Sequence, residues 1–187
     1  MGMADGRDGE RCLIISYSYS GHTHQIASAL RRVTGSDWCE IYPWQPYPMA
    51  FPELLAQVRK EIQGHVRPRL LPVSHTPQSY PIIFVGTPNW CGTMAPPLAA
   101  WLYQHDLSGK LLLPFYSHCG GVPCDLRQDV QALCPKADVG EALGILDGET
   151  GEAAEKIQQW LLRTEFAASS PKGGRGICST QNLEAPI

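Results

Sequence analysis

Short, continuously apolar segments alternate along this chain with amphipathic segments of helical period. The apolar runs fall at residues 12–17, 38–42, 82–86, 111–116 and 139–145, and the amphipathic segments at 24–33, 53–63, 96–105, 125–133 and 152–163. A strand that is apolar at every position has to be buried on both faces, and parallel strands joined through helices meet that condition. The sequence therefore predicts an α/β fold, a three-layer sandwich with a five-stranded parallel sheet.

The alternating pattern occupies one domain, which we place at residues 11–165 of the 187 in the chain. Residues 1–10 are rich in Gly and Asp and residues 166–187 carry Gly, Ser and Pro without apolar period, so we expect a disordered start and a flexible tail. No apolar run is long enough for a membrane span or a signal peptide. We therefore expect a cytoplasmic protein with no membrane partner.

Charge and cysteine usage exclude several classes of protein. The net charge is −3 and charged residues make up 18% of the chain, which argues against a basic nucleic-acid-binding protein. The seven cysteines are an odd number without a repeated Cys-x-x-Cys pair, so we expect free thiols in a reducing compartment and no metal site. A cross-link or a shared metal at Cys119 and Cys124 is the less favoured alternative.

The loop after the first predicted strand carries a row of hydroxyl groups directly before a helix. It reads Ser18-Tyr-Ser-Gly-His-Thr23 and contains no Lys or Arg. Amides at a helix N-terminus bind anions, and the hydroxyls can add donors to phosphate oxygens. Neither the P-loop lysine nor the dinucleotide Gly-x-Gly-x-x-Gly is present, which favours a single phosphate monoester. The alternative is that Ser20 only caps the helix.

Two further loops follow predicted strands at the same edge of the sheet, where doubly wound folds bind ligands. Residues 87–95 form the second loop, in which Trp90 beside Gly92 can offer a flat apolar face to a planar ring. The third loop, residues 117–123, contains Gly120 and Gly121, which let the backbone approach a ligand closely. The alternative for Trp90 is a core residue packed under a proline-rich turn.

Together these loops resemble the flavodoxin family. The resemblance rests on Ser/Thr-x-Ser/Thr-Gly-x-Thr at 18–23 and on Gly-x-Pro-x-Trp with its following turn at 86–97, and it is extended by residues 107–110 and 114–115. It implies a sheet of strand order 2-1-3-4-5 that binds FMN. By this resemblance the phosphate is held by Ser18, Tyr19, Ser20, Gly21, His22 and Thr23, and the isoalloxazine is flanked by Pro88, Asn89, Trp90, Cys91, Gly92 and Thr93 on one side and by Ser117, His118, Cys119, Gly120 and Gly121 on the other.

The resulting hypothesis is a redox protein that passes electrons through bound FMN, with no catalytic side chain and no metal. Residues 117–122 offer no Phe, Tyr or Trp to cover the outer flavin face, and the chain lacks a strongly acidic surface. Both features favour an NAD(P)H- or quinone-linked oxidoreductase over the alternative, a dedicated electron carrier fed by a reductase protein. A homodimer is an alternative to a monomer that the sequence does not decide.

Two more distant alternatives belong to other classes. One is a thiol-dependent hydrolase in which Cys119 beside His118, or Cys91, acts as the nucleophile. The other is a binding protein that keeps the fold and has lost the cofactor.

Overall fold

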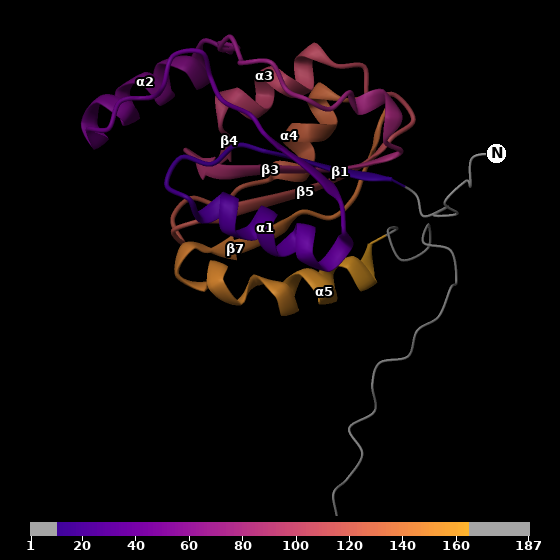
Figure 1. The fold of residues 1–187 in the computed structure, drawn as a ribbon. Helices are drawn as coiled ribbons and strands as arrows, with labels where there is room; N and C mark the ends of the chain where they lie inside the picture. The colour runs from indigo at the N-terminus through magenta and orange to yellow at the C-terminus, as the bar shows by residue number, and fades with distance from the viewer. Residues whose placement is uncertain (1–10, 165–187) are drawn as a thin grey trace, which may run out of the picture.

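The computed structural model describes residues 11–164, arranged as a parallel sheet between two layers of helices (Figure 1). The disordered start predicted at 1–10 and the tail predicted at 166–187 lie outside the described residues. Along the sheet the strands run in the order β2 (Asp37–Glu40), β1 (Cys12–Ser16), β3 (Ile82–Trp90), β5 (Leu111–His118) and β6 (Asp138–Val139), with β7 (Leu143–Leu146) also beside β5. All of these pairings are parallel. In the numbering of the predicted strands, β5 is the fourth strand and β6 and β7 together are the fifth. The α/β class and the predicted order 2-1-3-4-5 are therefore confirmed.

The fifth predicted strand, at 139–145, is split into β6 and β7. Val139 pairs with Leu112 and Leu143 pairs with Phe115, so three residues on the edge strand face only two on β5. One of those two is Pro114, which has no N–H to donate to the edge strand. The extra residue is accommodated as a bulge, the usual response where a ladder is interrupted.

The helices lie on both faces of the sheet, as the alternation predicts. One face is covered by α2 (Phe51–Gln63), α3 (Pro96–Gln104) and α4 (Leu126–Leu133), and the other by α1 (His22–Thr34) and α5 (Ala153–Arg163), with 3-10 turns at Pro77–Ser79 and Asp147–Glu152 (Figure 1). Within residues 11–164, no helix combines the length and the apolar character that a membrane crossing requires.

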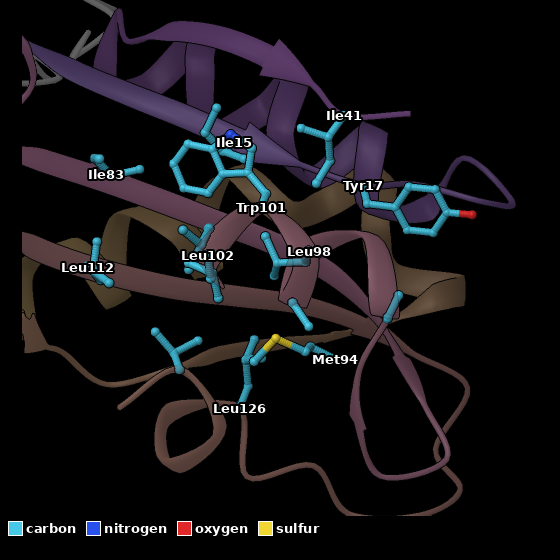
Figure 2. Packing of buried hydrophobic residues seen from close by; sticks show 14 of the residues in the cluster. Ile15, Tyr17, Ile41, Ile83, Met94, Leu98, Trp101, Leu102, Leu112 and Leu126 are labelled. Atoms are coloured by element: carbon cyan, nitrogen blue, oxygen red, sulfur yellow. The ribbon is translucent and has the colours of Figure 1, made fainter. Parts of the chain in front are cut away.

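Alternate residues along each strand point to opposite faces of the sheet and belong to two separate hydrophobic cores. Leu13 and Ile15 of β1 face the α2–α3–α4 layer, whereas Ile14 between them faces α1 and α5. Figure 2 shows Trp101 of α3 packed over the first of these cores, and Trp160 of α5 is as fully buried in the second. Burying an apolar side chain of this size contributes about 1.5 to 3 kcal/mol, so the two cores fix the sheet whose edge carries the loops.

Residues 87–95, predicted as a loop, form a β-hairpin instead. β3 continues to Trp90 and turns back into β4 (Thr93–Met94), with which it pairs antiparallel. Cys91 and Gly92 at the turn have φ of 55° and 88°, the pattern of a two-residue type I′ turn. The Thr87 hydroxyl accepts from the amide of Ala95 at 2.9 Å and closes the base of the hairpin. A Cys-Gly turn lacks the usual Asn-Gly signal, which is why the sequence did not indicate it.

Candidate functional site

All three predicted loops meet around one cavity at the carboxyl edge of the sheet. The cavity has a volume of about 300 Å³ and is lined by Tyr19, Ser20, Phe51, Leu54, Leu55, Val58, Pro88, Asn89, Trp90, Cys91, Ser117, His118, Cys119 and Asp147. The other predicted residues (Ser18, Gly21, His22, Thr23, Gly92, Thr93, Gly120 and Gly121) do not line it. Thr93 points to the opposite side of the hairpin, where its hydroxyl donates to Asp129 at 2.6 Å.

The first loop leads into α1, and the N-terminus of this helix is uncapped. Gly21 has a φ of 93°, and α1 begins after it without a side-chain hydrogen bond to its first amides. The first backbone bond of the helix runs from the Gln25 amide to the Gly21 carbonyl at 3.0 Å, so the preceding amides of residues 22–24 have no acceptor within the helix. Ser20 is therefore not a cap: its hydroxyl lies 3.2 Å from His22 Nδ1. The free amides and the helix dipole form an anion-binding end.

Internal hydrogen bonds hold this loop in place. The Ser18 hydroxyl accepts from the amide of Gly21 at 3.2 Å. The Thr23 and Ser117 hydroxyls lie 3.0 Å apart and are both nearly fully buried. This contact ties the start of α1 to the end of β5, and it occupies two hydroxyls that the sequence assigned to the cofactor.

A carboxylate that the sequence analysis did not select faces the same loop. Asp147 follows β7 directly, and its Oδ2 lies 3.4 Å from His22 Nδ1. Its Oδ1 is buried without a hydrogen-bond partner. A buried oxygen on the cavity wall that lacks a donor fits a ligand that brings hydroxyl groups. The position after the last strand, at the carboxyl edge, was the available signal for this residue.

Trp90 forms one wall of the cavity and is held by three tyrosines. Its ring makes edge contacts with the rings of Tyr17, Tyr19 and Tyr47 at centroid distances of 5.6, 5.8 and 5.0 Å. Tyr19 also donates its hydroxyl to the Pro48 carbonyl at 2.7 Å. Burial raises the pKa of Tyr17 and of Tyr47, so both rings stay neutral at ordinary pH. Trp90 is thus a fixed apolar surface that is still partly open to the cavity.

A second apolar wall comes from α2, which extends beyond the rest of its layer in Figure 1. Phe51, Leu54, Leu55 and Val58 all line the cavity. Sequence reasoning treated α2 only as a core helix. The adjacent pair Leu54-Leu55 was the available signal, because it makes the apolar stripe wider than the packing of one sheet face requires.

The thiol and histidine at the third loop do not form a nucleophile–base pair. His118 Nδ1 accepts from the amide of Gly120 at 3.1 Å, so that ring nitrogen is bonded to the backbone of its own loop instead of to the Cys119 thiol. The hydrolase alternative gains no support from this geometry. Across residues 11–164 there is also no cluster of three His, Cys, Asp or Glu side chains suited to a metal ion.

The strand order 2-1-3-4-5, with a cavity at the carboxyl edge where the loops after β1, β3 and β5 meet, defines a flavodoxin-like doubly wound fold. The family model described as Flavodoxin matches residues 11–164. The chain belongs to the flavodoxin family, whose cofactor is FMN.

Solved structures share the fold at low sequence identity. A protein from Bacteroides eggerthii classed as a flavoprotein is 22% identical, with a TM-score of 0.71 over 82% of this chain and 96% of that one. A second such protein, from Bacteroides uniformis, is 20% identical, with a TM-score of 0.73 over 83% and 100%. The flavoprotein from Lactobacillus acidophilus in complex with FMN is 18% identical, with a TM-score of 0.66 over 81% and 98%. No curated protein matches the chain in sequence.

Proposed function

We propose that the protein binds FMN in the cavity at the carboxyl edge and acts as an FMN-dependent oxidoreductase linked to NAD(P)H or a quinone. One observation carries the proposal: an uncapped helix N-terminus and an aromatic-walled cavity lie side by side at the end of β1. A flavin mononucleotide needs both, since it joins a phosphate to a planar ring. The flavoprotein from Lactobacillus acidophilus, which has the same fold, is described in complex with FMN.

The residues around the cavity fit the parts of FMN. The amides of residues 22–24 and the hydroxyls of Ser18 and Ser20 would hold the phosphate. The unpartnered Asp147 Oδ1 would accept from a ribityl hydroxyl. Trp90 would pack against the isoalloxazine on one side, with residues 117–121 on the other. The bound flavin supplies the redox chemistry, and the chain binds it, orients it and excludes water.

The walls of the cavity favour an enzyme over a dedicated carrier. The side chains that line the cavity include one carboxylate, Asp147, and no Lys or Arg. The four α2 side chains that line the cavity are apolar, and residues 117–122 contribute no Phe, Tyr or Trp. A flavin held between Trp90 and residues 117–121 would therefore have no aromatic ring over its outer face, which suits a neutral, planar substrate such as a quinone.

The experiment is an FMN titration of the purified apoprotein, followed by turnover. We expect FMN fluorescence to be quenched to a one-to-one end point, and Ser18→Ala to weaken binding because the loop loses the bond to the Gly21 amide. The matched control is Ser108→Ala, which changes an exposed serine bonded to Asp106, outside the cavity lining. Unchanged FMN fluorescence would contradict the proposal. It would favour the alternative of a binding protein that keeps the fold and has lost the cofactor.

Turnover separates the enzyme from the carrier. With FMN bound, we expect oxidation of NADH or NADPH to depend on an added quinone. A loaded protein that turns over neither nucleotide, and accepts electrons only from a reductase protein, would be a carrier.

A further inference from the structure

Two exposed thiols lie on the wall of the same cavity. Cys91 and Cys119 are the exposed cysteines among residues 11–164, neither is in a disulfide, and both line the cavity. Other thiols are less accessible: burial raises the pKa of Cys124 and of Cys134 to about 11. Thiol chemistry requires access and a thiolate, so within the described part of the chain it is concentrated at this cavity.

The segments that carry the two thiols are already in contact. The side-chain amide of Asn89 donates to the Val122 carbonyl at 2.7 Å, across the gap between the hairpin and the third loop. A Cβ built on Gly92 would lie 3.0 Å from Val122 Cγ1. Cys91 and Cys119 therefore sit on two neighbouring walls, with the cavity that both of them line between them.

Two glycines make the backbone beside Cys119 conformationally permissive. Gly120 and Gly121 follow it directly, and a Cβ at Gly121 would meet nothing within 4 Å. A disulfide needs its two Cα atoms within about 7 Å of each other, and this loop is the segment whose movement would meet that condition.

The backbone at Cys91 gives no conformational reason for a cysteine. Its φ of 55° places it in the left-handed region, at the first central position of the type I′ turn. Asn, Asp and Gly are the residues that this position favours. Left-handed residues other than glycine cost stability and cluster at functional sites, so the thiol itself is the feature to explain.

We propose that Cys91 and Cys119 form a reversible disulfide across the cavity, and that this disulfide and FMN exclude one another. The inference rests on the proposed function, which places FMN between these two walls. The oxidant is a low-molecular-weight disulfide. One protein thiolate attacks it and releases one small thiol, and the second protein thiolate then attacks the mixed disulfide and releases the other. Two protein thiols thus become one disulfide, and one small disulfide becomes two thiols.

Mutual exclusion makes the two equilibria reciprocal. If the disulfide weakens FMN binding by a given factor, FMN disfavours disulfide formation by the same factor. FMN binds the dithiol form, so it raises the midpoint potential of the thiol couple, by about 30 mV for each tenfold shift in the equilibrium.

The test oxidises the apoprotein in glutathione buffers of increasing oxidised fraction. We expect a loss of two hydrogen atoms in intact mass and a peptide that links Cys91 to Cys119. We also expect FMN affinity to fall about tenfold or more and to recover with dithiothreitol. Excess FMN should shift the oxidation midpoint to higher potential.

The variants isolate the pair. Cys91→Asn keeps a residue that the turn favours and removes one thiol, and Cys119→Ser removes the other. Each single variant should stop at the mixed disulfide and give no linked peptide, and the variant that carries both changes should bind FMN equally before and after oxidation. Cys124→Ser is the matched control and should behave like the unchanged protein, since Cys124 does not line the cavity.

Two results would overturn the inference: glutathione adducts on the separate cysteines without a linked peptide, or a linked protein with unchanged FMN affinity. If the reduced protein fails to bind FMN, the proposed function is wrong, while the linked peptide still reports on the thiols.

Discussion

Replacing Gly86 with alanine should destabilise the fold, because no space exists for one methyl group at the centre of the sheet. Gly86 lies in β3 and pairs with Phe115 on β5. A Cβ at Gly86 would lie 2.2, 2.5 and 2.8 Å from three ring carbons of Phe115, which is fully buried. The ring cannot move aside without displacing the core between the sheet and the α1–α5 layer, of which it is a part.

The magnitude follows from the cost of overpacking. An extra methylene in a well-packed core costs about 1 to 3 kcal/mol. The alanine also restricts the unfolded chain, which returns about 0.4 to 1 kcal/mol. We expect a net loss of about 1 to 2 kcal/mol, which lowers the Tm of a domain of this size by about 2 to 8 °C.

The assay is urea denaturation followed by circular dichroism, read as a lower midpoint at unchanged slope. The matched control is Gly148→Ala, where a Cβ would meet nothing within 4 Å and stability should stay equal or rise slightly. Phe115→Leu in the Gly86→Ala background should cost less than the sum of the two single changes, because it removes ring atoms from the clash. An unchanged midpoint for Gly86→Ala, or strict additivity in the double variant, would refute the reasoning.

Three further predictions test the loops and the packing. Asn89→Ala removes the bonds to the Gly92 amide and the Val122 carbonyl, and should weaken FMN binding about tenfold in a fluorescence titration. Trp160→Phe leaves the Glu141 carbonyl without its donor and should cost about 1 to 3 kcal/mol in urea denaturation. Burial raises the pKa of the Cys134 thiol to about 11, so this thiol ionises first in the unfolded chain and the stability of the fold should decrease as the pH rises above about 9. Cys134→Ala should make this decrease smaller in thermal melts recorded across that pH range.

Most of the fold could be predicted because burial on two faces leaves a strong sequence pattern. The strand at β1 and the helix at α1 each have an apolar period that allows one placement. The errors lie where local backbone chemistry decides. The bulge between β6 and β7 depends on Pro114 of a different strand, and the hairpin at Cys91–Gly92 depends on a left-handed turn with an unusual residue.

The candidate site was predictable in its loops but incomplete in its walls. The strand ends brought residues 18–23, 87–93 and 117–121 to one edge, as parallel topology requires. Phe51 and Leu55 reach the cavity from α2, and the widened apolar stripe at Leu54-Leu55 could have indicated a second apolar contact but not that the contact is this cavity. Thr23 and Ser117 were assigned to the cofactor by the family resemblance, which cannot show that two hydroxyls bond to each other.

The weak attachment of α2 has a consequence for how the cavity responds to ligands. Of its thirteen residues only Leu54 and Val58 are buried, whereas seven of the nine in α3 are. Amide hydrogens of α2 should therefore exchange with deuterium well before those of α3, because local opening follows the amount of buried contact. The wall that varies most easily is then the one that α2 supplies, and a bulky ligand would be accommodated by local unfolding of this helix while the sheet stays intact.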